Sequence, residues 1–155
     1  MKLRQYERNR TAASRHLFFA RLPPHRASDY EKAAVWAFTG ENTSLSSAVL
    51  GELAEREGFA SNALAAKNAV DSIPHVRLRD LLSSLRRSPV LRRVKKIIVA
   101  RNRRVPFREQ HLLRDSVAIE SRRILMRYAT PPRAHALATV FGENWGVTMQ
   151  GLGLI

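Results

Sequence analysis

The sequence contains no cysteine among its 155 residues. This excludes a disulfide framework and any thiolate metal site, and it fits a reducing compartment such as the cytoplasm, the nucleus or a nucleoid. Long hydrophobic runs are also missing, because no apolar stretch approaches the roughly 18 residues of a membrane span. Hydrophobic residues still make up 45% of the chain, as in an ordinary folded domain. We therefore expect a soluble, single-domain intracellular protein without a membrane span.

Recognisable catalytic and metal-binding patterns are absent as well. The five histidines show no metal-ligand spacing, and no glycine-rich loop precedes a helix to hold a phosphate group. We expect no metal, no cofactor and no enzymatic activity. A metal-independent nuclease that uses His75 or His111 beside arginines is the enzymatic alternative.

Acidic residues are scarce in one part of the chain. The net charge is +14, from 27 basic and 13 acidic residues, and 22 of the basic residues are arginine. Residues 72–104 carry eleven basic residues and one acidic residue, whereas residues 28–71 carry three basic and seven acidic ones. Such segregation produces a directed electric field, and guanidinium groups suit phosphate well. Residues 1–27, with seven basic residues and one acidic residue, also resemble an organelle presequence in composition.

The hydrophobic pattern predicts an all-α protein, a compact bundle of about seven helices, with a helical dimer as the alternative arrangement. Proline, glycine and serine separate segments with helical periodicity. The predicted helices cover residues 2–21, 28–40, 44–57, 61–73, 78–85, 89–105 and 107–129, with a last short helix ending at Phe141. We expect residues 1–141 to form one helical domain and residues 142–155 to form an apolar tail.

Residues 94–107 allow a second interpretation. The β-branched run Ile97-Ile98-Val99 could belong to a β-hairpin that turns at residues 101–104. The periodicity favours a helix.

A basic face is the main functional signal. On a helix that starts at Pro89, the apolar residues Val90, Leu91, Val94, Ile97 and Ile98 share one arc, and cations occupy the opposite arc. No acidic residue lies between Asp80 and Glu109 to neutralise these cations. The predicted nucleic-acid-binding residues are Arg86, Arg87, Arg92, Arg93, Lys95, Lys96, Arg101, Arg103 and Arg104, with Arg4, Arg8 and Arg15 of the first helix.

Aromatic residues are missing from residues 72–106, with Phe107 the nearest. Proteins that read single-stranded RNA stack bases on aromatic rings, so their absence favours recognition of the phosphate backbone and the duplex shape. We expect a non-catalytic nucleic-acid-binding protein of weak sequence specificity, with duplexes preferred and RNA marginally favoured over DNA. The alternatives are a structural subunit of a ribonucleoprotein or of a viral or phage nucleoprotein, and binding to a membrane surface.

One segment resembles the centre of a helix-turn-helix. Ala54, Gly58 and Ser61 occupy the positions of the small residue in the first helix, the glycine in the turn and the cap of the recognition helix. The resemblance implies a transcription regulator built on residues 50–70, which would recognise DNA through Asn62, Lys67 and Asn68. An ordinary helical corner that ends in a glycine cap is the alternative.

The predicted helix 107–129 is apolar on two sides. One arc contains Leu113, Val117, Ile124 and Tyr128, and the other contains Leu112, Ile119 and Met126. A helix of this kind is central in its own core or is shared with a second chain. We expect a homo-oligomer that forms through Leu113, Val117, Ile124, Tyr128 and the apolar tail 142–155; packing of the tail on its own domain is the alternative.

Overall fold

The computed structural model describes residues 35, 38, 39, 66 and 68–155. This part of the chain contains helices and no strand, so the predicted all-α class is confirmed. The helices are α6 (His75–Arg87), α7 (Pro89–Ala100), α8 (Phe107–Leu125), α9 (Pro131–Glu143) and α10 (Trp145–Gly151). Apart from residues 35, 38 and 39, the helices predicted within residues 2–57 lie outside the described residues, as does the helix-turn-helix pattern at residues 53–64. Of the helix predicted at 61–73, residues 66 and 68–71 are described and helical, and the helix ends at residue 71.

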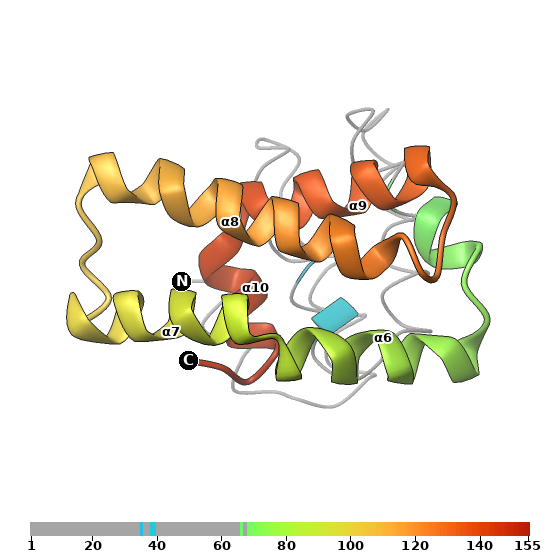
Figure 1. Ribbon diagram of the computed structural model, residues 1–155, viewed down its shortest axis with the longest axis horizontal. Coiled ribbons are helices and arrows are strands. Elements are labelled where there is room, and N and C mark those ends of the chain that lie inside the picture. The colour runs from blue at the N-terminus through green and yellow to red at the C-terminus, as the bar shows by residue number, and fades with distance from the viewer. Residues whose placement is uncertain (1–34, 36–37, 40–65, 67) are drawn as a thin grey trace, which may run out of the picture.

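Helices α6 and α7 follow one another along one side of the described bundle, and α8 and α9 lie along the other (Figure 1). Ser88 alone separates α6 from α7. Its side chain accepts a hydrogen bond from the backbone N–H of Leu91 at 3.2 Å, and Pro89 occupies the first turn of α7. Serine as the N-cap followed by proline is the pattern that predicted this helix start, and it is confirmed.

Helix α7 ends at Ala100, five residues before the predicted end at Val105. Asn102 and Arg103 adopt left-handed conformations with φ of 50° and 61°. The N–H of Asn102 donates to the carbonyl of Val99, and that of Arg103 donates to the carbonyl of Ile98, both at 2.9 Å. These two bonds form a Schellman motif, which asparagine tolerates better than most residues. The β-hairpin interpretation of residues 94–107 is therefore wrong.

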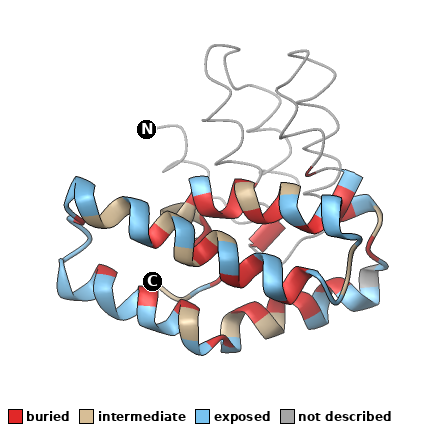
Figure 2. Ribbon diagram, turned by 45° about the horizontal axis from the view of Figure 1, so that its top comes forward, coloured by how far each residue is buried: buried red, intermediate tan, exposed pale blue. Residues whose placement is uncertain are grey.

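Helix α8 is the central element of the described part. It contacts α6, α7, α9 and α10, and one of its faces is buried (Figure 2). Leu113, Val117 and Ile124 are only 2%, 0% and 3% exposed. The prediction that these three residues form an interface with a second copy is therefore wrong, because the chain's own core uses them. Tyr128 is half-buried, and its hydroxyl lies 3.3 Å from that of Ser84.

The C-terminal segment predicted as a tail contains helix α10, which contacts α8 and α9. Met149 and Leu152 are buried in the core. The helix ends in a second Schellman motif, in which Gly153 has a φ of 76° and the N–H of Leu154 donates to the carbonyl of Met149. The apolar residues of this segment therefore pack within their own chain.

A buried carboxylate connects α8 to the junction of α6 and α7. Glu120 is 4% exposed and accepts hydrogen bonds from the hydroxyl of Ser88 and from the guanidinium of Arg123. The Arg123 hydrogen bonds are the main cause of a lowered Glu120 pKa, and the Ser88 hydrogen bond adds to them, while burial opposes the shift. Ser88 thus caps α7 and binds α8 with the same hydroxyl group.

Helices α8 and α9 cross closely at Gly142. A Cβ atom there would lie 2.7 Å from the Ala118 Cβ and 2.7 Å from the Arg114 carbonyl oxygen. We predict that Gly142→Ala lowers the free energy of unfolding by about 1–3 kcal/mol, because the two helices would have to separate. Gly146→Ala is the matched control, since a Cβ there meets no atom within 4 Å. The control should be neutral or stabilising by up to about 1 kcal/mol. Urea unfolding measures both, and equal effects would contradict the close crossing.

Glu120 should make the fold sensitive to acid. Its folded-state pKa is below the ordinary value of 4.5, so its stabilisation is fully present above about pH 4.5 and is lost as the pH falls through the lowered pKa. We predict that Glu120→Gln lowers the free energy of unfolding by about 1–3 kcal/mol at pH 7 and reduces the further loss on acidification. Urea titrations at several pH values measure this. Asp80→Asn, at an exposed carboxylate, is the control; an acid response equal in the wild type and Glu120→Gln would contradict the assignment.

Candidate nucleic-acid interface

Helix α7 separates apolar and cationic residues onto opposite faces. Leu91, Val94 and Ile98 are buried in the core. The four cations of this helix, on the other arc, are exposed: Arg92, Arg93, Lys95 and Lys96. The 100° step between residues places the two groups on opposite sides, and burial of the apolar arc holds the cations toward solvent. Val99, which is 59% exposed, is the one large apolar residue among these cations.

The cations of this face lack acidic neighbours. Within the described part of the chain, Arg87, Arg93, Lys95 and Lys96 form no ion pair with a carboxylate. Arg92 donates only to the backbone carbonyl of Arg86, at 3.4 Å. Like charges this close together repel one another, so an external anion would lower the electrostatic free energy of the surface.

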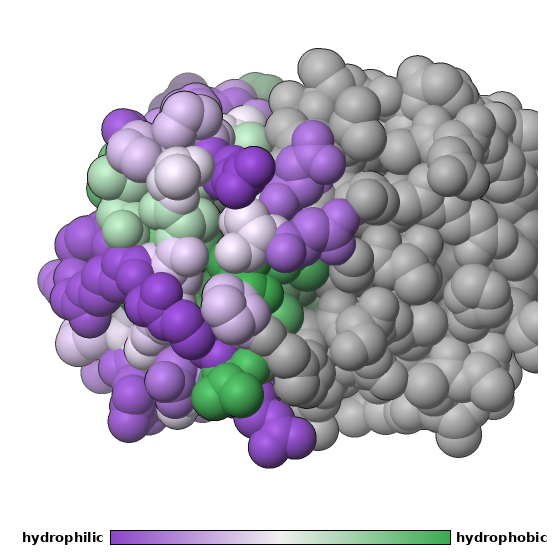
Figure 3. All heavy atoms as spheres, turned by 90° about the vertical axis from the view of Figure 1, so that its right-hand side faces the viewer, coloured by the Kyte–Doolittle hydropathy of each residue, from purple (hydrophilic) through white to green (hydrophobic). Residues whose placement is uncertain are grey.

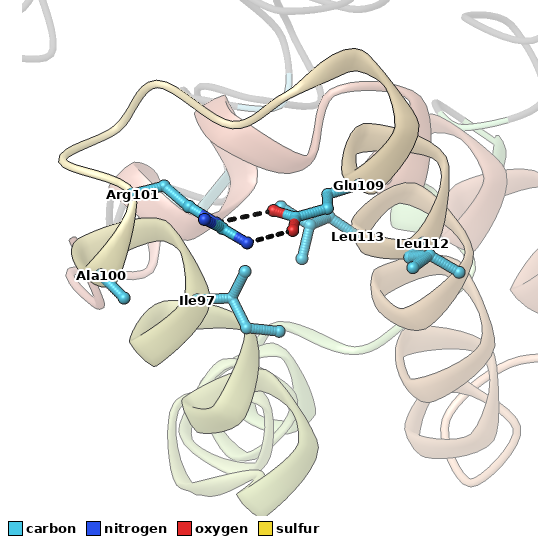
Figure 4. Close-up of a pocket in the computed structure, with 6 residues that line it drawn as sticks. All are labelled: Ile97, Ala100, Arg101, Glu109, Leu112 and Leu113. Carbon is cyan, nitrogen blue, oxygen red and sulfur yellow. Dashed lines mark hydrogen bonds and ion pairs between the residues drawn. The ribbon is translucent and has the colours of Figure 1, made fainter.

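Two of the predicted contact residues bind within the chain. Arg86 is half-buried and donates to the carbonyls of Leu152, at 3.2 Å, and Thr39, at 3.4 Å. Arg101 forms a two-pronged ion pair with Glu109 that bridges the space between α7 and α8 (Figure 4). Arg86 is thus a structural residue that holds the end of α10, and the charge of Arg101 is locally compensated.

Arg103 and Arg104 were predicted to lie on the helical arc of α7. They lie instead in the turn after this helix. Both are exposed, and neither has an ion pair within the described residues. The turn lies at one end of the long axis of the molecule, where α7 passes into α8 (Figure 1). Arg103 and Arg104 therefore extend the basic face beyond the C-terminal end of α7. Arg4, Arg8 and Arg15 lie outside the described residues.

Phe107, for which no role was predicted, is the first residue of α8 and follows the turn that contains Arg103 and Arg104. Its ring is 74% exposed and contacts the ring of His111 edge to face, with the centroids 4.9 Å apart. Arg104 and Arg108 flank it in the sequence, and both are exposed. Pro106 is the sequence signal that could have identified Phe107 as an exposed residue. It ends the loop before α8, so Phe107 falls in the first turn of this helix, before the first buried residue, Leu113.

Two hollows mark the described surface. One, of about 320 Å³, lies between α7 and α8, where Ile97 and Leu112 line it with the Arg101–Glu109 pair (Figure 4). The other, also of about 320 Å³, lies where α8 passes into α9, and Arg127 and Arg133 contribute to its lining. Figure 3 views this end of the molecule, where hydrophilic side chains cover most of the described surface. The basic surface of the chain therefore extends beyond the face of α7.

The described residues hold no group of three or more histidine and carboxylate side chains that could bind a metal ion. Within the same residues, no helix has the length and apolar character needed to cross a membrane.

Comparison with protein-family models, curated proteins and solved structures finds no match to this chain.

Proposed function

We propose that this protein is a non-catalytic nucleic-acid-binding protein that contacts the phosphate backbone through the cationic face of α7 and the turn after it. The binding surface consists of Arg87, Arg92, Arg93, Lys95, Lys96, Arg103 and Arg104. The supporting observation is that these side chains are exposed, and that none forms an ion pair with a carboxylate in the described part of the chain.

Phosphate groups are the ligands that best fit this surface. Five of the seven cations are arginines, whose planar guanidinium groups donate two parallel hydrogen bonds to phosphate oxygens. The cations of α7 lie along a helix of twelve residues, about 18 Å in length, which spans several phosphates of a nucleic-acid strand. Binding of this kind depends little on base sequence, because the phosphates carry no sequence information.

Phe107 adds a contact with a base to the proposed interface. The ring is exposed three residues after Arg104, and an aromatic ring can stack on any of the four bases. A base inside a duplex is already stacked, so only an unpaired base can reach the ring. We therefore propose that a single-stranded end next to a duplex is bound more tightly than a blunt duplex.

Charge reversal tests the backbone interface. We predict that the triple variant Arg92→Glu, Arg93→Glu, Lys96→Glu weakens binding to every nucleic acid and lowers the salt slope on duplex DNA by about 2–3, because each lost phosphate contact contributes about 0.9. Fluorescence anisotropy over a salt series measures this with duplex and single-stranded RNA and DNA. The triple variant Arg79→Glu, Arg127→Glu, Arg133→Glu changes the net charge equally with exposed residues elsewhere.

The control variant should lose less affinity and keep most of the slope. Equal losses in both triple variants would show that the total charge governs binding and that α7 does not. Absence of binding by the wild type at low salt, with all four nucleic acids, would refute the proposed function.

Phe107→Ala should remove the preference for single-stranded ends. We predict about a tenfold loss of affinity for a duplex with an overhang, from lost stacking, and little change for a blunt duplex. Anisotropy measures the ratio of the two affinities, and Phe107→Trp should retain it. Since the ring is exposed, its removal should leave the thermal midpoint near that of the wild type. A ratio unchanged by Phe107→Ala would contradict the stacking contact.

A further inference from the structure

The outer face of α8 carries a row of exposed apolar side chains. Leu112 is 66% exposed, Ile119 is 70% exposed and Met126, which directly follows the helix, is 43% exposed. The three residues are spaced seven apart, so they lie in one row along the helix, opposite the buried row formed by Leu113, Val117 and Ile124. Large apolar side chains gathered on one face of a surface helix indicate a contact with another molecule.

The row is symmetric about its middle residue. If two α8 helices pack antiparallel with the two-fold axis at Ile119, then Ile119 faces its own copy and Leu112 lies opposite Met126 of the second copy. Every apolar residue in the row then meets an apolar residue. An unrelated partner would have to supply this spacing, whereas a second copy supplies it by symmetry.

The charges beside the row are also complementary to themselves. Asp115 and Arg122 are exposed and flank the same edge of the row. In the antiparallel arrangement, Asp115 comes within one residue, about 1.5 Å along the axis, of the level of Arg122 in the second copy. The two-fold axis repeats this contact, so the pair of helices gains two reciprocal ion pairs. Asp115 is already near Arg114, with 3.2 Å between Nε and Oδ1, but 58% of its side chain is exposed and open to a further partner.

The overall charge of α8 permits this contact. The helix carries four basic and three acidic residues, a net charge of +1, whereas α7 carries four basic residues and no acidic one. Two copies of the α8 face would therefore repel each other less than two copies of the α7 face. Among the helices compared, α8 is therefore the better surface for self-association of a strongly basic protein.

From these observations we infer that the chain forms a symmetric dimer through antiparallel packing of α8 on α8 of a second copy. Leu112, Ile119 and Met126 form the apolar centre, and Asp115 and Arg122 set the register. The interface is small compared with the roughly 800 Å² per partner of a standard interface, so the dimer should dissociate in the micromolar range. It leaves the cations of α7 outside the contact and does not depend on the proposed function.

Sedimentation velocity of the full chain, from low micromolar to several hundred micromolar protein, tests the inference. The wild type should pass from monomer to dimer with increasing concentration. Ile119→Glu should remain a monomer at every concentration, because symmetry would place two carboxylates against each other. Val76→Glu is the matched control, since Val76 is 77% exposed on α6, and this variant should associate like the wild type.

A charge exchange tests the register without removing apolar surface. Asp115→Arg should weaken the dimer about tenfold, and the double variant Asp115→Arg, Arg122→Asp should recover most of that loss. Circular dichroism confirms that each variant is folded. A wild type that remains a monomer at the highest concentration, at both low and high salt, would overturn the inference. It would also be overturned by a dimer that Ile119→Glu leaves unchanged, or by failure of the double variant to recover the loss.

Discussion

The buried carboxylate of Glu120 fixes the direction in which the cationic face of α7 points. It accepts hydrogen bonds from Ser88, the residue that caps α7, and from Arg123 on its own helix. Ser88 is also the one residue between α6 and α7, so the interaction holds the junction of two helices against the centre of a third. Once the start of α7 is fixed there, burial of Leu91, Val94 and Ile98 determines its rotation, and the cations can only face outward.

The same part of the chain has its acidic residues gathered mainly on one helix. Residues 72–155 contain seventeen basic and five acidic residues. Three of the five carboxylates, Glu109, Asp115 and Glu120, form ion pairs with arginines, and all three belong to α8. The acidic residues thus neutralise arginines on and beside α8 and leave α7 without compensation. The +4 charge of α7 is therefore a property of the fold as well as of the composition.

Local sequence signals predicted the elements well where one residue determines the backbone. Ser88-Pro89 predicted the start of α7, and the prolines at 74, 106 and 131–132 predicted the breaks before α6, α8 and α9. Gly142 was expected to follow the end of the last helix, but it lies inside α9. The end of α7 was predicted five residues too late, because its stop signal is Asn102 in a left-handed conformation and not a glycine or a proline. The continuation of the chain into α10 was missed because glycines at 146 and 151 suggested a loop. At Gly151 the requirement is tertiary, since a Cβ atom there would overlap the side chain of Thr39.

The site was predicted less completely than the fold, and the reason is again tertiary contact. The helical periodicity correctly separated the buried residues of α7 from the exposed cations. It could not show that Arg86 donates to the end of α10, or that Arg101 pairs with Glu109 across the α7–α8 turn. For α8, periodicity identified two apolar arcs but gave no means of deciding which one faced the core. The structure assigned the core to Leu113, Val117 and Ile124, which moved the candidate interface to the opposite arc.

The proposed nucleic-acid contact and the proposed dimer should respond to salt in opposite directions. Phosphate binding releases counterions and weakens as salt rises. Association of two chains that each carry +14 is opposed by long-range repulsion, which salt screens over about 10 Å at 0.1 M. The apolar centre on α8 does not weaken in the same range, and its two ion pairs are exposed and contribute little. A polyanion bound to α7 would neutralise part of the positive charge of each chain and so reduce the same repulsion. It should therefore favour the dimer even if it never contacts α8. The two surfaces would then be coupled through charge alone, without a conformational change between them.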